Sequence, residues 1–444
     1  MRGNLEQGKL KIRIPSVAHI LMGVTEYLWV AFIILNGNSI YHSNSTRNLY
    51  LPEIILVLTF LLLVMNLTFY KCNPSKSGVL GAVIIMAYTA IYFCLMEHTM
   101  SATVFLEMFI VGAPMMYLLF SELYRHGRLL KLLRKFSDLV CILAVVSLFF
   151  WFFGEVFGII RPNGYVNIAW GNFDVVEGYY GVHFAFQRDT TFFPNQDLLR
   201  NSGIFSEAPM FNLWLNIAVA IELFLKPRAS KLRVAILALT VFTTLSVTGI
   251  LFLVLCVLLF ALSHIREMNR LQTCVMILTG FVVLPALAFV VYQSMTLKVD
   301  TESYMMRISD YEGGVRLWMD NPFFGAGFGN LSAFKPYVYT PFTISAAGFS
   351  NSIVAVLGTG GAWMALLYYI PHFGIVVPRC TGSKKFSCFG VCILYLFITT
   401  IFFARFIGVI FVVLGYVILS GSKEPHCLPE WEEAPDRHGV RESR

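Results

Sequence analysis

Charged side chains that could bind a substrate gather in two long polar segments of an otherwise apolar chain. The first segment, about residues 161–206, holds Arg200 and ends just before Glu207, at the start of an apolar run. The second segment, about residues 294–345, holds Arg307. A guanidinium is planar and permanently charged and suits phosphate oxygens, whereas a carboxylate near a bilayer is costly unless it faces water or a partner. The pattern predicts arginines that bind an anion and a glutamate that accepts a proton, unless these are ordinary interfacial charges.

A short helix is expected in the second segment, because its charges repeat at helical spacing. Arg307 and Asp310 would share one face of this helix, and Glu312 and Arg316 another. The helix should end before Pro322, since a proline disfavours helical backbone at the residue that precedes it. Arg316 is therefore a second candidate for the anion site, although plain ion pairs would also explain both couples.

Three glycines at alternate positions, Gly325, Gly327 and Gly329, follow this expected helix. Glycine lets the backbone turn and approach a neighbour closely, and successive N–H groups in such a turn can hold an anion. A close-packed re-entrant turn is the more common use of the pattern. Both interpretations make the segment a lid that places arginines over a substrate.

Lipid must be the main solvent of the chain. Hydrophobic residues make up 57% of the 444 residues and charged residues only 13%, whereas soluble domains are about a quarter charged. The net charge of +7 therefore predicts a basic cytoplasmic side and no nucleic-acid partner. The nine cysteines are scattered without a CxxC pair, so they are expected to be small hydrophobic residues and neither disulfides nor zinc ligands.

Twelve transmembrane helices are predicted, because about 20 apolar residues cross a bilayer as a helix. Two apolar runs are too long for one helix; "SVTG" at 246–249 breaks the first and Arg405 breaks the second, so each is expected to form a helical hairpin. The expected spans are 16–36, 50–70, 79–97, 101–120, 138–160, 207–226, 232–247, 249–265, 272–293, 346–370, 387–403 and 406–421. The fold class is an all-α polytopic membrane protein with two long structured external loops, which are expected to contain short helices.

Basic residues alternate along the loops of this topology. With both termini in the cytoplasm, 24 of the 33 lysines and arginines fall inside and eight outside, as the positive-inside rule requires. Arg405 lies between the last two spans and is expected to face the bundle interior or a cavity and not lipid, with Gly408 giving it room. The first span is too long for a signal peptide and is expected to be a retained anchor. Residues 1–421 would form the membrane domain, and the polar stretch 422–444 a disordered cytoplasmic tail.

Four stretches together resemble a known family: "RNSGIFSEAPMF" before a span, "LSVTG" on a paired span, "RLWMDNPFFGAGFGN", and "FSNSIVAVLGTGGAWMALL". They occur in the order seen in the O-antigen polymerase and O-antigen ligase superfamily, over roughly residues 195–370. The resemblance implies a glycosyltransferase of the bacterial inner membrane that takes a glycan from undecaprenyl diphosphate and builds polysaccharide on the outer face. It also implies that Arg200, with Arg307 or Arg316, holds the lipid diphosphate. Arg307 stands at the more usual distance from the glycines.

One departure from the family pattern bears on the reaction. Ligases of this superfamily commonly carry His-Asn at the start of the span after the second loop, whereas this chain has Ser350 and Asn351 there. The departure favours a polymerase of O-antigen, capsule or exopolysaccharide over a ligase. A flippase and a chain-length regulator would then be further partners. Glu207, the acid nearest a matched motif, is the expected acceptor of the proton from the acceptor sugar hydroxyl.

The sequence contains no Asp-x-Asp pair, HExxH or P-loop, so no metal or cofactor is expected and arginines would neutralise the departing diphosphate. A twelve-span transporter is the alternative from a different class. Glu26 and Glu107 within predicted spans favour it, because ionisable residues inside a membrane often line a pathway. Against it, the chain shows no repeat at a half-chain offset and no matched pair of interrupted spans.

Overall fold

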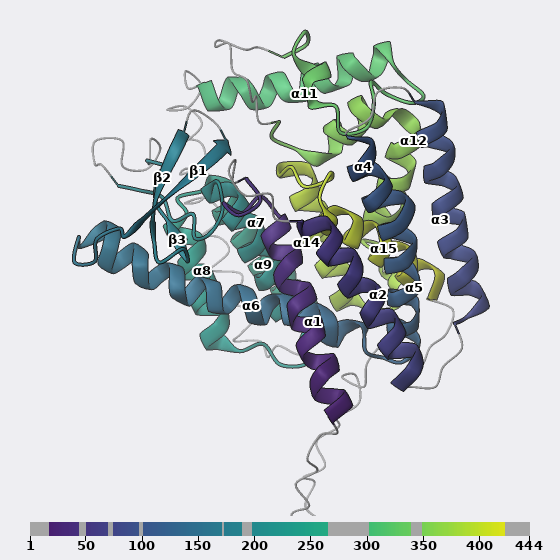
Figure 1. The fold of residues 1–444 in the computed structure, drawn as a ribbon, viewed down its shortest axis with the longest axis horizontal. Coiled ribbons are helices and arrows are strands. Elements are labelled where there is room, and N and C mark those ends of the chain that lie inside the picture. Colours follow the sequence, from purple (N-terminus) through teal and green to yellow (C-terminus); the bar gives the residue numbers. More distant parts are fainter. Residues whose placement is uncertain are drawn as a thin grey trace, which may run out of the picture.

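The computed structural model describes residues 17–43, 50–69, 74–96, 101–170, 173–188, 198–264, 302–338 and 349–421. These residues form a bundle of helices, with one helix lying across one end and a small sheet beside it (Figure 1). The helices are α1 (Val17–Asn36), α2 (Leu51–Phe69), α3 (Lys76–Leu95), α4 (Ala102–Phe105), α5 (Ala113–Arg125), α6 (Leu129–Phe150), α7 (Ala208–Ala220), α8 (Lys231–Thr243), α9 (Val247–His264), α11 (Glu302–Asp320), α12 (Ser352–Gly374), α13 (Pro378–Thr381), α14 (Lys384–Thr399) and α15 (Phe406–Gly421). Wider or tighter helical turns form η1 (Leu106–Gly112), η2 (Trp151–Val156), η3 (Ile221–Leu225) and η4 (Leu331–Phe334), and the strands are β1 (Gly164–Trp170), β2 (Phe173–Tyr179) and β3 (His183–Phe184).

The fold class predicted from the sequence is confirmed. Each expected span within the described residues coincides with a helix, and eight helical segments there are long and apolar enough to cross a bilayer by length and composition. Helices α8, α14 and α15 are shorter, at 13, 16 and 16 residues. The span expected at 272–293 lies outside the described residues, as does the tail at 422–444, so the number of twelve stays a prediction.

Both apolar runs are broken as predicted, although the first break lies about two residues before the expected position at 246–249, where residues 247–249 already belong to α9. The first apolar run is split at residues 244–246, here called the hinge, where Leu245 takes a left-handed conformation with φ of 49°. Such a backbone is uncommon for a bulky residue and marks a sharp local turn. The second run is split between the end of α14 and the start of α15, at the segment that holds Arg405.

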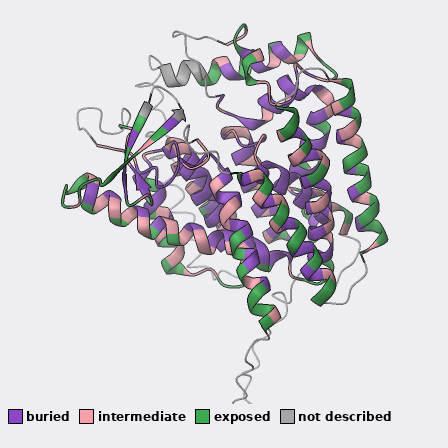
Figure 2. Ribbon diagram, in the orientation of Figure 1, coloured by how far each residue is buried: buried purple, intermediate pink, exposed green. Residues whose placement is uncertain are grey.

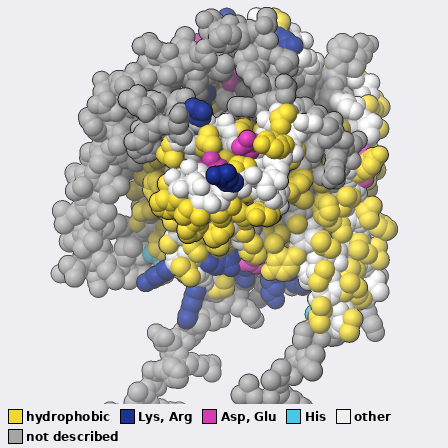
Figure 3. Space-filling model, turned by 60° about the vertical axis from the view of Figure 1, so that its left-hand side comes forward, with side chains coloured by type: hydrophobic (Ala, Val, Ile, Leu, Met, Phe, Trp, Pro, Cys, Tyr) yellow, Lys and Arg dark blue, Asp and Glu magenta, His cyan; other side chains and the backbone are white. Residues whose placement is uncertain are grey.

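The two ends of the bundle differ in charge. The end at which α1 begins, here called the basic face, holds most of the described lysines and arginines, around residues 125–135, 226–233 and 379–385. The other end, here called the loop face, holds the sheet, the hinge and α11. Figure 3 shows hydrophobic side chains in a band, with basic side chains along its lower edge. This pattern is what a bilayer-spanning protein with one positively charged side presents.

Helices α7 and α15 lie at the centre of the bundle, where buried residues gather in Figure 2. In the membrane-length segment that contains α7, 89% of the residues are buried. In the α3 and α9 segments the buried share is only 22% and 17%, which leaves wide apolar faces for lipid. Glu26, one basis for the transporter alternative, is held by two basic side chains, Arg128 just before α6 at 3.0 Å and Lys135 of α6 at 3.3 Å. Paired in this way, Glu26 joins α1 to α6.

The first long loop holds a three-stranded antiparallel sheet in the order β1-β2-β3, so the expectation of short helices there is wrong. Side chains from alternate positions of the sheet, such as Ile168 and Val176, pack with Phe184 and with Ile40 from the end of α1. This small core forms between segments far apart in sequence, which local spacing does not predict. The second loop holds α11, which ends at Asp320 as predicted from the proline that follows.

Candidate active site

Five segments of the chain meet on the loop face. They are residues 37–43, 198–207, 244–246, 349–351 and 400–405. The Ser206 hydroxyl donates to the carbonyl oxygen of Asn38 at 2.9 Å, and the Ser352 hydroxyl donates to that of Thr400 at 2.7 Å. Residues from both ends of the chain and from its middle are therefore fixed against one another at this face.

Arg200 is half-buried and is held against the hinge. Its Nε donates to the carbonyl oxygen of Thr244 at 2.9 Å, which fixes the plane of the guanidinium. Its backbone N–H donates to the carbonyl oxygen of Gln187 at 2.7 Å. Arg200 is thus anchored by the first loop on one side and by the hinge on the other.

Glu207 is half-buried and occupies the position just before the first turn of α7. Its own side chain does not cap the helix; instead the Gln187 side-chain oxygen accepts the N–H of Ala208 at 3.0 Å. Gln187 therefore bonds beside both Arg200 and Glu207 and ties them into one region. The positive end of a helix favours a carboxylate in this position.

Arg307 and Asp310 lie on the part of α11 that packs over the start of α12 and the end of α14. The Asp310 carboxylate accepts the backbone N–H of Ser350 at 2.9 Å, and the Tyr311 hydroxyl donates to the carbonyl oxygen of Ile398 at 2.6 Å. Burial raises the pKa of Asp310, although the Ser350 hydrogen bond and the positive charge of Arg307 oppose the rise. The predicted proximity of Arg307 and Asp310 is therefore confirmed, and the acid also anchors α11 on α12.

A link between Arg307 and the start of α9 runs through Tyr395 of α14. The charge of Arg307 acts on the hydroxyl of Tyr395, and that hydroxyl donates to the carbonyl oxygen of Thr248 at 2.9 Å, two residues beyond the hinge. Arg200 contacts the other end of the same segment, at Thr244. Arg200 from the first loop thus contacts the hinge directly, whereas Arg307 from the second loop is linked to the start of α9 through Tyr395.

Arg316 lies on the outward face of α11. Its guanidinium is 3.7 Å from the Glu312 carboxylate, and the two side chains are 67% and 62% exposed, so they form the predicted ion pair at the surface. Asp310 and Leu317 lie on the buried face. An α-helix turns about 100° per residue around its axis. Measured around that axis, Arg307 lies about 70° from the middle of the buried face and Arg316 about 110°. Both arginines are exposed, but Arg307, which the family resemblance favoured, lies closer to the buried face than Arg316.

The glycine turn, residues 321–330, packs into a break in α12. Gly325, Gly327 and Gly329 have φ of 71°, 95° and 77°, and Gly361 of α12 has φ of 60°. The N–H of Ala326 donates to the carbonyl oxygen of Gly358 at 3.1 Å, so the turn and α12 share backbone hydrogen bonds.

A side chain would not fit at this contact. A Cβ atom on Gly325 would lie 2.4 Å from the Thr359 carbonyl, and one on Gly361 would lie 2.4 Å from the Gly325 nitrogen. The N–H of Gly325 donates to the carbonyl oxygen of Asn321 at 3.0 Å. These contacts support the close-packed, re-entrant interpretation of the turn over the anion nest.

On the loop face, His42 and Arg405 form a pair that the sequence did not predict. Nη1 of Arg405 lies 2.5 Å from Nε2 of His42, which is 363 residues away in the sequence. Burial and the Arg405 charge lower the pKa of His42 to about 3, and burial lowers that of Arg405 to about 10, so a charged arginine faces a neutral imidazole. The prediction that Arg405 faces a protein partner is confirmed. Gly408 instead allows close packing against the backbone before α15, because a Cβ at this position would lie 2.6 Å from the Phe402 carbonyl oxygen.

Asn351, the residue that follows the missing histidine of the family pattern, is 1% exposed. Its Oδ1 accepts the N–H of Val354 at 3.0 Å and caps α12. Its Nδ2 is buried without a hydrogen-bond partner among the described residues. A buried amide in this state is costly, so the position is suited to a polar group of a ligand.

Residues 232–370 match the family described as O-antigen ligase. The matched region runs from α8 into α12 and includes the hinge, Arg307, Arg316, the glycine turn and Asn351, whereas Arg200 and Glu207 precede it. The match confirms the resemblance to the O-antigen polymerase and ligase superfamily and indicates a glycosyltransferase of that type. No match was found among curated proteins.

Proposed function

We propose that this protein is a polysaccharide polymerase of the bacterial inner membrane. It would transfer a glycan from undecaprenyl diphosphate to the acceptor sugar of a second lipid-linked repeat unit, making O-antigen, capsule or exopolysaccharide. The observation that supports the proposal is that Arg200 bonds to Thr244 of the hinge, while the charge of Arg307 acts on Tyr395, whose hydroxyl bonds to Thr248 at the start of α9. The O-antigen ligase family match over the second loop supports the same chemistry.

The reaction needs a charged leaving group to be neutralised and a proton to be removed. A hydroxyl of the acceptor sugar attacks the anomeric carbon of the donor glycan; a new C–O bond forms while the bond from that carbon to the diphosphate oxygen breaks. The bonding electrons leave with the lipid diphosphate, and Arg200 and Arg307 stabilise its developing charge. Glu207 accepts the proton of the hydroxyl. The proposed step uses side chains of this chain alone.

The supports around these residues favour a preorganised site. The hinge carbonyl orients Arg200, Gln187 fixes the start of α7 beside Glu207, and Asp310 holds α11 on α12. The glycine turn locks the other end of α11 into the break of α12. Because donors fixed before the reaction need little reorganisation, such supports lower the barrier at the site. Arg405, held by His42, adds positive charge to the same face.

A ligase is the second candidate, favoured by the description of the matched family. Ser350 stands where ligases of the superfamily commonly carry histidine, and its backbone N–H is bonded to Asp310. An imidazole for acid–base work is thus absent from that position in the sequence, which favours the polymerase. In the proposed orientation the loop face is external and the basic face cytoplasmic, and a flippase and a chain-length regulator would act beside the polymerase.

A reconstituted reaction distinguishes these functions. The purified protein is mixed with undecaprenyl-diphosphate-linked repeat units, and the products are separated by length. A ladder of longer lipid-linked glycans is expected for a polymerase. Transfer only to an added lipid core acceptor would identify a ligase, and uptake into vesicles without any new glycosidic bond would identify a transporter.

The role of Glu207 has a matched control in the same loop. Glu207→Gln removes the proton acceptor and should lower the rate by about 100-fold or more, as for other general bases. Glu177→Gln changes an exposed acid of β2 and should leave the rate within about threefold. Equal rates in the two variants would contradict the catalytic role of Glu207.

A further inference from the structure

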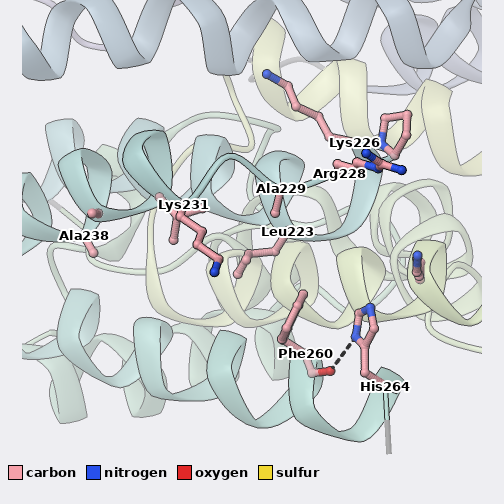
Figure 4. Close-up of a pocket in the computed structure, with 12 residues that line it drawn as sticks. Leu223, Lys226, Arg228, Ala229, Lys231, Ala238, Phe260 and His264 are labelled. Atoms are coloured by element: carbon pink, nitrogen blue, oxygen red, sulfur yellow. Dashed lines mark hydrogen bonds between the residues drawn. The ribbon is translucent and has the colours of Figure 1, made fainter. Parts of the chain in front are cut away.

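A cavity of about 590 Å³ opens at the basic face, opposite the candidate active site (Figure 4). It lies between the turn from η3 to α8, the first half of α8, the last turn of α9 and the first turn of α14. In Figure 4, Lys231 of α8 and Phe260 and His264 of α9 border the same space. The cavity is here called the basic pocket.

The mouth of the basic pocket carries several positive charges. Lys226, Arg228, Lys231 and Lys385 line it together with His264, and no carboxylate is among its described lining residues. Lys226 is already compensated, because Glu222 lies 2.7 Å and Asp138 3.2 Å from its ammonium. Arg228 and Lys231 are exposed at the mouth, where no carboxylate of the lining opposes them.

Two helix ends add to this positive potential. Lys231 is the first residue of α8, and Lys385 is the second residue of α14. Helix amino-terminal ends carry unpaired N–H groups and a partial positive charge, so lysines in these positions repel the helix dipole and an anion is attracted. The described residues thus place cationic side chains at two ends that already favour an anion.

The inner part of the pocket is apolar. Leu223, Val234, Ala238 and Phe260 line it, and Ala238 lies about two helical turns along α8 from Lys231. The pocket therefore runs from a charged mouth at the edge of the bundle towards the hydrophobic band. A ligand that matches both parts has a phosphate group joined to a hydrocarbon chain.

We propose that the basic pocket binds the phosphate headgroup of an anionic phospholipid in the adjacent leaflet, with the start of an acyl chain along α8. Basic pockets between membrane helices on the positively charged side suit such headgroups, because lysine and arginine form charge-assisted hydrogen bonds to phosphate oxygens. The site lies at the opposite end of α8 and α9 from the hinge, so it is separate from the proposed donor site. A bound lipid joins α8, α9 and α14 and thereby stabilises the helices that carry the hinge.

Lipid titration of the full chain in a neutral detergent tests this proposal. Binding of phosphatidylglycerol, measured by native mass spectrometry, should be saturable and should raise the melting temperature, whereas phosphatidylcholine should do neither. The same titration with inorganic phosphate separates a lipid from a free anion. A thermal shift with phosphate as large as with phosphatidylglycerol would overturn the lipid assignment.

Two double variants of equal charge change locate the site. Arg228→Gln with Lys231→Gln should weaken phosphatidylglycerol binding by about 30-fold, since each basic residue near a lipid surface contributes about a fivefold effect. Arg379→Gln with Lys384→Gln alters exposed residues of the same face outside the pocket and should change binding by less than about threefold. Equal weakening in the two double variants would show nonspecific surface attraction and overturn the proposal.

A third variant keeps the test valid if the first double variant does not fold. Ala238→Phe fills the apolar part of the pocket without changing any charge. It should weaken phosphatidylglycerol binding by about tenfold or more, because the acyl chain loses its place beside α8. Unchanged lipid binding in this variant would refute the proposed position of the chain.

Discussion

Arg307→Lys and Arg316→Lys form a matched pair, because both substitutions keep a positive charge on the same helix. Both side chains are exposed, but Arg307 borders the buried face of α11 and its charge acts on Asp310 and Tyr395, whereas Arg316 forms an ion pair with Glu312 on the outward face. If the proposed donor site is right, the two arginines differ sharply in their effect on polymer synthesis. Charge alone would make them alike.

The expected magnitude follows from the shape of the guanidinium. Arginine can offer two parallel N–H donors to a phosphate, whereas lysine offers a point charge, so Arg307→Lys loses about one charge-assisted hydrogen bond. Such a bond is worth about 1.5–3 kcal/mol, which corresponds to a rate about 10- to 150-fold lower. An exposed ion pair contributes only about 0–1 kcal/mol to stability, so Arg316→Lys should leave the rate within about threefold.

The assay is the initial rate of chain extension with purified protein and lipid-linked repeat units. Protein amount and melting temperature are measured for each variant, so that a loss of rate can be separated from a loss of folded protein. Full activity of Arg307→Lys, or an equal loss in both variants, would refute the assignment of the diphosphate to Arg307.

Three further predictions concern the fold. Gly325→Ala should strongly reduce the yield of folded protein, because the new Cβ would lie 2.4 Å from the α12 backbone at a left-handed φ. The control Gly23→Ala in α1 places its Cβ more than 4 Å from other atoms and should be tolerated. Equal yields of the two variants would contradict the tight packing of the turn. The pKa of His42 is lowered to about 3, so the unfolded chain binds this proton from about pH 6.5 downwards and the folded chain does not. The melting temperature should therefore fall as the pH falls below about 6.5, and less so in His42→Gln; parallel curves would contradict this. A cysteine at Ser332 should react with an impermeant thiol reagent in intact cells and one at Lys384 should not, and the reverse result would invert the proposed topology.

Local patterns predicted the parts of the fold that depend on neighbouring residues. The proline after Asn321 correctly marked the end of α11, and Arg405 correctly marked the break of the second apolar run; the break of the first run lies just before most of "SVTG", whose last three residues belong to α9. These features follow from backbone preferences within a few residues. The helical spacing also placed Arg307 beside Asp310 and Arg316 beside Glu312.

Contacts across long sequence separations were not predictable in the same way. The His42–Arg405 pair spans 363 residues, and neither residue lies in a motif that points to the other. The sheet of the first loop depends on a core that it shares with Ile40. The glycine pattern suggested a turn, but its partner, the break of α12 at Gly361, became visible only in three dimensions.

The sequence contains a helical pattern that could have distinguished Arg307 from Arg316. Leu317, like Asp310, belongs to one stripe of α11, and a stripe of this kind indicates the face that packs on the bundle. Arg307 borders the stripe and Arg316 does not. This stripe is hard to recognise in the sequence, because α11 as a whole has the polar composition of a surface helix and its buried face is short.

The central claim is that Arg200 and Arg307 bind one lipid diphosphate, and a cryo-electron microscopy structure with undecaprenyl diphosphate tests it most directly. The predicted result is a diphosphate on the loop face beside the hinge, with both guanidiniums about 2.7–2.9 Å from its oxygens and the Glu207 carboxylate facing the same space. A diphosphate bound away from the hinge, or contacted by Arg316 and not by Arg307, would contradict it.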